Sequence, residues 1–308
     1  MASNPTHRRA RPHPAPLFDV PSYLFLTAVV VNTVLISQAL QPILLALLAL
    51  SQAFLLVGCQ EAKHQCVHGS FVSNGRLNDA LGILCAALFG VNFVAYRYFH
   101  FRHHRATCTD EDPEGKLYAV SWRTRWIWIL APIELPWVAW HINRVGCPMV
   151  PSGQRGLWLA AFVGMVAFAV ALSAAAWCAP HTVVWGYLVP IAIFTWFDFL
   201  LTQAEHYDAP IIPAPSQRPS GTITLDITLP LGLGWLTLHR SLHAIHHRYP
   251  GMRWFEAPRR LRADPAAEPI SYFAFVRRWL VAGPRLWTPA NAGPQPAAPH
   301  GNDTSSQT

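Results

Sequence analysis

Long apolar segments alternate along the chain with shorter polar ones. After Asp19, neither Val20–Ser37 nor Pro42–Gly58 contains a charged residue, and Gln38–Pro42 between them has the composition of a tight turn. At about 1.5 Å per helical residue, each segment is roughly as long as a bilayer is thick. The pattern therefore predicts a transmembrane hairpin.

A second hairpin is predicted further along. Leu157–Trp177 and Val183–Leu201 are again apolar and of about bilayer length, and a short turn at 178–181 joins them. His181 falls in that turn, at the far end of the hairpin from the other histidines. We therefore do not expect His181 to bind a metal ion.

Two further apolar segments, Leu77–Tyr96 and Trp126–His141, interrupt this regular plan. If the first crossed the bilayer, histidines before and after it would lie on opposite sides and could not share a site. We expect it to be a re-entrant or interfacial helix. The same is expected of the second segment, because two prolines and a glutamate interrupt it. His141 is then an interfacial residue rather than a ligand.

The two ends of the chain lack any apolar periodicity. Residues 1–18 are rich in proline and basic residues, with no sign of a cleaved signal peptide, and are expected to be a disordered cytoplasmic tail. Residues 288–308 are expected to be a second disordered tail. A single membrane domain is predicted at 19–287.

Composition and charge support a membrane protein. Hydrophobic residues make up 52% of the 308 residues and charged residues only 13%, which is too apolar for an ordinary soluble domain. None of the 23 Lys and Arg residues lies within 20–58 or 157–201. This positive-inside pattern predicts a multi-pass protein whose termini and connecting segments are cytoplasmic. The net charge of +7 is thus a topology signal, and no nucleic-acid partner is expected.

Histidines cluster in the polar segments. The spacing H-x-x-H-H occurs twice, and a pair four residues apart precedes both copies. Residues three and four apart share a face of a helix, so each cluster can direct its imidazoles at one point. A single cluster could equally be a solvated patch or a structural zinc site. Three clusters between apolar spans favour a transition-metal centre.

A further histidine, at the end of the fourth span, completes a set of nine candidate ligands. The nine are His64, His68, His100, His103, His104, His206, His243, His246 and His247. Nine exceed what one metal ion can use, but suit two ions with four or five each. Structural zinc takes four ligands, and iron–sulfur clusters need thiolates. Two iron ions that activate dioxygen fit best.

These clusters, in this order, resemble the histidine boxes of the membrane-bound fatty-acid desaturase and hydroxylase family. The resemblance covers roughly residues 20–262 and rests on Lys63–Phe71 (KHQCVHGSF), Tyr98–Arg105 (YFHFRHHR) with Asp112-Pro113-Glu114, Glu205-His206, and His243–Pro250 (HAIHHRYP) with Pro258–Leu261. It implies an all-α integral membrane protein in which four transmembrane helices carry a cytosolic helical cap and a di-iron site lies between them.

Some positions depart from the common pattern of that family. Gln65 and Val67 replace the Asp and Gly often found in the first box, where they are expected to affect the surroundings of the metal rather than its ligands. His239 stands where many members carry Asn or Gln. It is either a donor that orients a metal ligand or an idle surface residue.

The resemblance implies an oxygen-dependent oxidoreductase that takes a hydrogen atom from an unactivated C–H bond. Loss of a second, adjacent hydrogen gives a double bond, whereas return of oxygen gives an alcohol. We expect a fatty-acyl desaturase; the alternative is a hydroxylase or ketolase of an acyl, alkane, carotenoid or secondary-metabolite substrate. A metal transporter is disfavoured because the first two spans contain no ionisable residue.

Electrons are expected to come from a separate ferredoxin- or rubredoxin-like protein. The basic residues after the third box could bind such an acidic donor or, equally, anionic lipid headgroups; they are Arg259, Arg260, Arg262, Arg277 and Arg278.

The predicted topology can be tested by side-specific labelling. Cysteines introduced at Gly75 and at Arg97 should react with a membrane-impermeant thiol reagent from the same side of sealed vesicles, because Leu77–Tyr96 does not cross. Reaction from opposite sides would separate the first two histidine clusters and exclude a shared centre.

Overall fold

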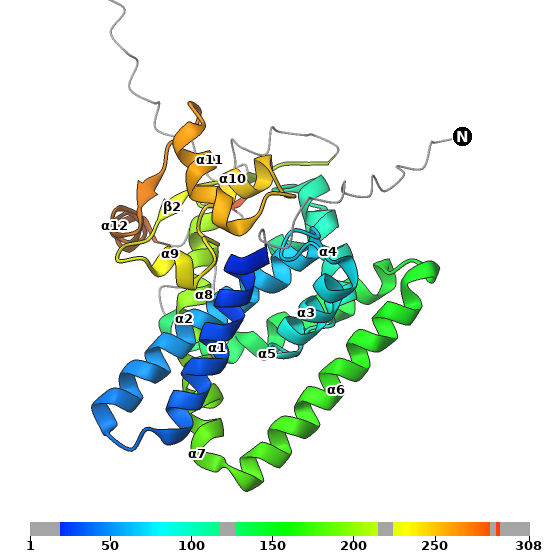
Figure 1. Ribbon diagram of the computed structural model, residues 1–308. Helices are drawn as coiled ribbons and strands as arrows, with labels where there is room; N and C mark the ends of the chain where they lie inside the picture. Colours follow the sequence, from blue (N-terminus) through cyan, green and yellow to red (C-terminus); the bar gives the residue numbers. More distant parts are fainter. Residues whose placement is uncertain (1–18, 118–126, 215–223, 284–287, 290–308) are drawn as a thin grey trace, which may run out of the picture.

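A computed structural model describes residues 19–117, 127–214, 224–283 and 288–289 (Figure 1). The predicted tail at 1–18 lies outside the described residues. So does the tail at 288–308, apart from Thr288–Pro289, which form β4. The fold is predominantly helical, as predicted, and each of the four strands in the described residues is only two residues long.

Both predicted hairpins are helical. The first consists of α1 (Val20–Gln38) and α2 (Pro42–Val67), and the second of α6 (Arg155–Cys178), α7 (Pro180–Val183) and α8 (Val189–Glu205). In the described part of the chain, four helices are long and apolar enough to cross a membrane, which confirms the number predicted.

The fourth of these helices is not uniform. The segment Val184–Leu188, between α7 and α8, is π-helical. Pro190 follows at the start of α8, and proline cannot donate the backbone hydrogen bond that a continuous α-helix requires. The wider π turn accommodates this missing donor without ending the helix.

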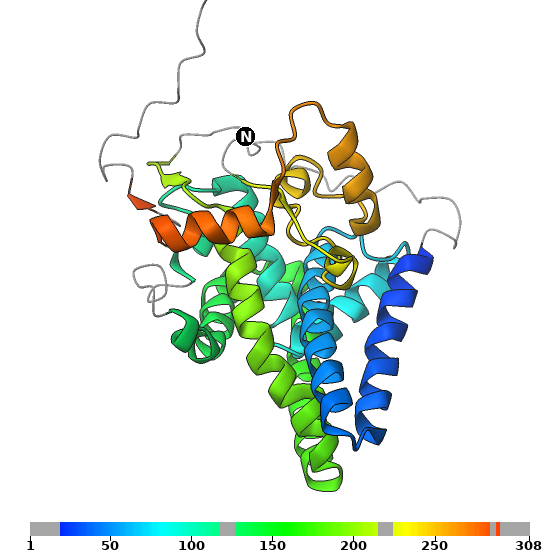
Figure 2. The same ribbon diagram turned by 90° about the vertical axis from the view of Figure 1, so that its left-hand side faces the viewer.

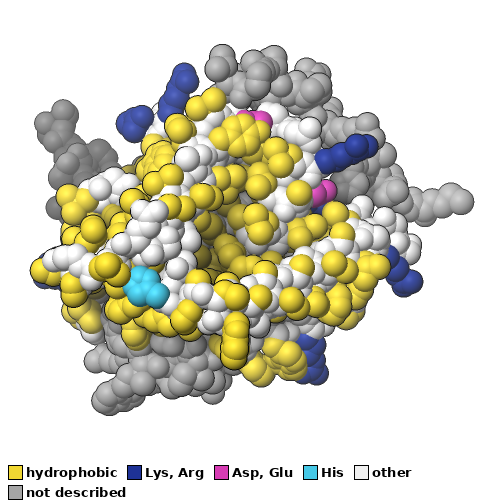
Figure 3. All heavy atoms as spheres, turned by 60° about the horizontal axis from the view of Figure 1, so that its bottom comes forward, with side chains coloured by type: hydrophobic (Ala, Val, Ile, Leu, Met, Phe, Trp, Pro, Cys, Tyr) yellow, Lys and Arg dark blue, Asp and Glu magenta, His cyan; other side chains and the backbone are white. Residues whose placement is uncertain are grey.

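The hairpins present an apolar surface. Seen from the end that carries the α1–α2 turn and α7, hydrophobic side chains cover most of the face, and basic side chains appear at its rim (Figure 3). Helix α6 is the least buried of the four, with only 6% of its most apolar stretch buried inside the protein. Such a surface suits contact with lipid rather than water.

The two intermediate apolar segments differ from the prediction. Leu77–Tyr96 is not one helix: α3 (Gly75–Ala87) ends, the chain turns through Gly90 at φ 67°, and α4 (Phe93–Ala106) begins. Asn92 forces the restart, because its side chain accepts hydrogen bonds from the first free backbone N–H groups of α4. At 13 residues, α3 is too short to span a bilayer.

The second intermediate segment is longer than expected. Helix α5 (Ile127–Gly146) continues through both prolines that were predicted to interrupt it. Short 3₁₀ turns, Cys147–Met149 and Ser152–Gln154, connect α5 to α6, and another, Pro113–Lys116, follows α4.

Residues 224–283 fold over one end of the hairpins and are called the cap (Figures 1 and 2). Its elements are β2 (Ile227–Thr228), α9 (Leu233–Leu236), α10 (His243–Arg248), the 3₁₀ turn Trp254–Glu256, α11 (Ala257–Ala263), β3 (Ile270–Ser271) and α12 (Tyr272–Ala282). Strand β2 pairs in parallel with β3, and β1 (Pro210–Ile211) pairs with β4.

A buried polar cluster ties the cap to the first hairpin. Arg253 donates to the Asp19 carboxylate at 2.6 Å and to the Ser73 hydroxyl at 2.7 Å. Burial alone would raise the pKa of Asp19, but hydrogen bonds from Ser73 and Arg253 outweigh it and lower the pKa. The Trp254 indole N–H donates to Ser22 Oγ at 3.1 Å, beside this pair. The cap is thereby fixed to the start of α1.

The close approach of the cap to α2 requires a glycine. A Cβ at Gly58 would lie 2.3 Å from the Leu236 carbonyl oxygen and 2.5 Å from the Phe25 ring. We expect Gly58→Ala to destabilise the protein by about 1–3 kcal/mol, as overpacked cores are. The measurement is thermal unfolding in detergent. Gly156→Ala is the control, because a Cβ there meets nothing within 4 Å; equal stability of the two variants would contradict the packing argument.

Candidate metal centre

The first histidine pair lies at the end of α2. This helix continues well beyond the predicted span end at Gly58 and stops at Val67, so His64 is in its last turn and His68 is its C-cap residue. Both side chains thus project from the cap end of the second span. Helix α4 carries the second cluster on its last two turns.

The remaining candidates come from α8 and the cap. His206 caps the C-terminus of α8. The third cluster lies on the six-residue helix α10, which a buried carboxylate helps to form: Asp226 accepts the backbone N–H of Ile245 at 3.0 Å. Burial raises the pKa of Asp226, an effect opposed by that hydrogen bond and by Arg248 nearby.

The structure brings all nine predicted histidines into two adjacent groups. In each group, one ligand atom from every member lies within 4.8 Å of those of the others. The first group is His64, His68, His100, His104 and His246; the second is His103, His206, His243 and His247. The groups touch, since the imidazole of His104 stacks on that of His247 with ring centroids 4.4 Å apart.

In the first group, the facing atoms are all Nε2. The Nε2 of His100 lies 2.9 Å from that of His64, 3.1 Å from that of His68 and 2.8 Å from that of His104. The Nε2 of His246 lies 3.2 Å from that of His104. One ring nitrogen has either one proton or one lone pair, so hydrogen bonds alone cannot satisfy three such contacts at His100.

The second group has the same arrangement. The Nε2 of His243 lies 3.2 Å from that of His206 and 2.9 Å from that of His247, whose Nε2 is 3.4 Å from that of His103. With metal–nitrogen bonds of about 2.0–2.1 Å, ligands at right angles are about 2.9 Å apart and tetrahedral ones about 3.4 Å. The observed spacings match those expected of imidazoles around a metal ion.

Three of these rings have a carboxylate at Nδ1: Glu61 and Asp112 are buried, and Glu114 is partly exposed. Nδ1 of His64 is 2.9 Å from Glu61, Nδ1 of His100 is 3.2 Å from Glu114, and Nδ1 of His103 is 3.0 Å from both oxygens of Asp112. A carboxylate at Nδ1 retains the proton there and leaves the Nε2 lone pair for a metal ion. It would also place negative charge beside a bound metal ion.

One of these carboxylates is itself fixed by the unusual residue of the first box. Gln65 donates to Glu61 Oε1 at 2.8 Å, and the Ser70 hydroxyl donates to Gln65 Oε1 at 2.6 Å. Gln65 is thus connected to His64 through Glu61.

The electrostatics favour neutral imidazoles at most positions. Burial, and then the neighbouring histidines, lower the pKa of the ligand candidates at positions 68, 100, 104, 243, 246 and 247. His103 differs: burial lowers its pKa, but Asp112 and Glu114 outweigh this and raise it to about 9. A cation at Nε2 of His103 must therefore displace a proton at neutral pH.

A cavity of about 60 Å³ adjoins both groups. Its lining includes His64 and His100 from the first group and His243 from the second. Arg240 also lines it; the guanidinium contacts Asp198 and donates to Glu205 at 3.0 Å and to Thr202 at 2.8 Å, all on α8. The apolar part of the wall consists of Leu117, Val138 and Ile142.

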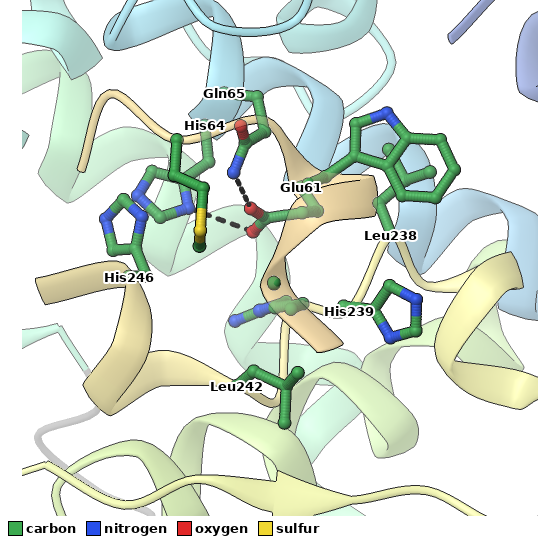
Figure 4. A pocket seen from close by; sticks show the side chains of 11 residues that line it. Glu61, His64, Gln65, Leu238, His239, Leu242 and His246 are labelled. Atoms are coloured by element: carbon green, nitrogen blue, oxygen red, sulfur yellow. Dashed lines mark hydrogen bonds and ion pairs between the residues drawn. The ribbon is translucent and has the colours of Figure 1, made fainter. Parts of the chain in front are cut away.

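His239 lines a second, smaller pocket beside the first group (Figure 4). Its ring lies on the opposite side of that pocket from His64 and His246, close to Gly234 and tilted against Trp254. Burial lowers its pKa to about 4. Within the described residues, no hydrogen bond joins it to any of the nine histidines.

Two further histidines, at positions 141 and 181, lie outside the two groups. His141 packs against the rings of Phe99 and Trp137, and His181 is on α7 at the opposite end of the second hairpin. Neither belongs to the two groups among the described residues.

Sequence reasoning assigned no role to Glu61 or Arg240. Glu61 precedes His64 by three residues in the same helix, a spacing that places the two on one face and could have identified it. Arg240 meets Asp198 and Glu205 only through the tertiary fold, and no local pattern indicates that contact.

The fold and the site together define a helical protein with an apolar frame and two imidazole groups suited to metal ions. A family model described as fatty acid desaturase matches residues 39–279, which is most of the chain. The protein therefore belongs to the fatty acid desaturase family.

Its curated relatives are plant desaturases. The chain is 23% identical over 235 residues to the chloroplastic sn-2 acyl-lipid omega-3 desaturase (ferredoxin) of Helianthus annuus, covering 67% of this chain and 52% of that protein. It is 25% identical to the chloroplastic omega-3 fatty acid desaturase of Ricinus communis, with 67% and 50% covered. For the endoplasmic reticulum omega-3 enzyme of Vigna radiata var. radiata, the identity is 25%, with 61% and 56% covered. The chain spans about half the length of these relatives.

The role of Asp112 leads to a quantitative expectation. Asp112→Asn should weaken metal binding about 10- to 100-fold, because an amide cannot hold the His103 proton and accept from the backbone N–H groups of Cys108 and Glu114 as a carboxylate does. The measurement is metal content after dialysis against graded chelator. Glu111→Gln removes the same charge from an exposed pair with Arg102 and should bind metal normally; equal losses would assign the effect to net charge.

Proposed function

We propose that this protein is an integral membrane oxidoreductase that binds two iron ions and uses dioxygen to desaturate a fatty-acyl chain. The observation that carries the proposal is the pair of touching imidazole groups in a member of the fatty acid desaturase family. Nine imidazoles divide into five and four, which suits two first-row metal ions better than one.

Each part of the chain has a separate task at this centre. Helices α2 and α4 supply most of the first group, and α8 and α10 most of the second. Glu61, Asp112 and Glu114 fix the tautomers of their histidines. Two iron ions, when bound, would supply the activation of dioxygen and the removal of hydrogen from an unactivated C–H bond.

The reacting carbon would lie in the cavity that adjoins both groups. Leu117, Val138 and Ile142 offer apolar contact to a hydrocarbon chain. Opposite them, the pairing of Arg240 with Glu205 and Asp198 neutralises charges that would otherwise repel such a chain. Positioning within this cavity would decide between loss of a second hydrogen and return of oxygen.

The proposed topology follows from charge and from the four apolar helices. Both termini and the two histidine groups would be cytoplasmic, with the α1–α2 turn and α7 on the opposite side. The absence of Lys and Arg from 20–58 and 157–201 supports this orientation.

The electron donor would be a separate acidic protein of the ferredoxin or rubredoxin kind. Helix α11 offers a basic surface for it, since Arg259, Arg260 and Arg262 are exposed there. This helix lies at the opposite end of the molecule from the α1–α2 turn (Figure 1), and its first residue, Ala257, lines the same small pocket as His246. A donor bound there would therefore be close to the first group.

The ligand assignment is tested by substituting one histidine at a time. His246→Ala should abolish turnover and lower the bound iron, as should Ala at each of the other eight positions. His181→Ala should change neither, because His181 is remote from both groups. Iron content by mass spectrometry and product formation with a reducing system provide the readout. A fully active His246→Ala enzyme would remove that residue from the centre.

The reaction itself is tested by mass spectrometry of lipids and acyl thioesters from cells that produce the wild-type protein or His246→Ala. A product lacking two hydrogen atoms, formed only by the wild type, is the expected result. Gain of one oxygen atom would assign the protein as a hydroxylase. An unchanged acyl pool would exclude an acyl substrate.

A further inference from the structure

One edge of the cap exposes large apolar side chains that the metal centre does not explain. Leu231, in the loop between β2 and α9, is 97% exposed. On α12, Phe273 is 70% and Val281 77% exposed, and Leu280 is exposed as well. Isolated exposed residues need no explanation, but these residues belong to two segments joined by the β2–β3 pairing, in which Thr228 lies opposite Ser271.

The segment 229–236, which includes α9, packs beside α1 and α2, beyond the start of α1 and before the end of α2. The Trp235 ring meets that of Phe25 on α1 at 6.3 Å, and the Leu236 backbone contacts α2 at Gly58. Gly58 is nine residues before the end of α2 at Val67, or about 13 Å along the helix. The loop therefore reaches the depth of the first hairpin's apolar surface, where the exposed Leu24 adjoins Phe25.

Helix α12 lies at the level where the fourth span ends. Its buried face packs on the last turn of α8 and the residues just beyond it: Trp279 donates to Gln203 at 3.2 Å, and Phe275 meets the Tyr207 ring at 5.4 Å. Figure 2 shows α12 running across the end of α8 rather than along it. A helix in this position lies roughly parallel to the membrane surface if the hairpins span the bilayer.

The exposed face of α12 has the composition of an interfacial helix. Arg277 and Arg278 accompany the apolar residues, and Arg278 also pairs with Asp208. Apolar side chains with basic residues beside them suit the boundary between acyl chains and anionic headgroups. This edge adjoins the apolar surface of α1. Contact with lipid explains that continuity, whereas contact with a second protein would not require it.

We propose that the segment 229–236, which includes α9, and helix α12 form an in-plane anchor that immerses this edge of the cap in the interface of the bilayer. This inference rests on the proposed membrane topology. Its occupant is the lipid itself, with anionic headgroups next to Arg277 and acyl chains around Leu231, Phe273 and Val281. Leu238, His239 and Arg240 follow the loop directly and line the pocket beside His64 and His246, so lipid contact also positions that wall of the site.

The experiment uses spin labels on the full chain, loaded with iron and reconstituted into vesicles that contain anionic phospholipid. Single cysteines replace Leu231 and Val281 in a Cys178→Ser background, because Cys178 is the native cysteine that is exposed in the described residues. A spin label at Val170→Cys, on the exposed face of α6, serves as the reference for a lipid-exposed position. Ala266→Cys, in an exposed loop of the cap after α11, reports water.

Collision rates with oxygen and with a neutral water-soluble nickel chelate distinguish the outcomes. Labels at 231 and 281 should behave like the label at 170, with oxygen access several-fold above nickel access, whereas position 266 should show the reverse. Nickel access at 231 and 281 equal to that at 266, with position 170 still in lipid, would overturn the anchor alone. Water access at position 170 would instead overturn the proposed topology. Protection of 231 and 281 from both reagents would assign the edge to contact with a second copy of the chain and reject the lipid.

Discussion

The structure depends on nine imidazole rings whose Nε2 atoms converge at distances that hydrogen bonds cannot satisfy. His100 faces three other Nε2 atoms at 2.8–3.1 Å, and protons can serve only one such contact. Metal ions bound there would resolve this conflict and at the same time join segments far apart in the sequence. His64 in the last turn of α2, His206 at the end of α8 and His246 in the cap would thus become parts of one unit, and folding would be coupled to metal binding.

The polar network around the rings would balance the positive charge of bound metal ions. Glu61 is held by Gln65, Asp112 by backbone N–H groups, and Arg240 by the acidic residues of α8. Such groups are costly to bury unless each has a partner. The ion pair of Arg253 with Asp19 follows the same rule where the cap contacts the start of α1.

The long apolar helices and the grouping of the histidines could be predicted because their signals are local. Uncharged segments of bilayer length and the H-x-x-H-H spacing are visible in single stretches of sequence. Three features were not predictable in this way. The break in Leu77–Tyr96 depends on the Asn92 side chain, which accepts the first free backbone N–H groups of α4. Helix α5 continues through its prolines, whose effect depends on the tertiary surroundings of the helix. The partners of Arg240 are brought together only by the packed fold.

The π-helical segment Val184–Leu188 influences the centre without touching it. Each residue turns a helix by about 100°, and a π turn accommodates one residue more than an α turn. All of α8 is therefore rotated by roughly that angle relative to an uninterrupted helix, including Asp198 and Glu205, which meet Arg240, and His206 at its end. The direction in which His206, a candidate ligand, points is thus set several turns away, by five residues none of which is a candidate ligand. The length of this segment constrains the site more strongly than the identity of its side chains.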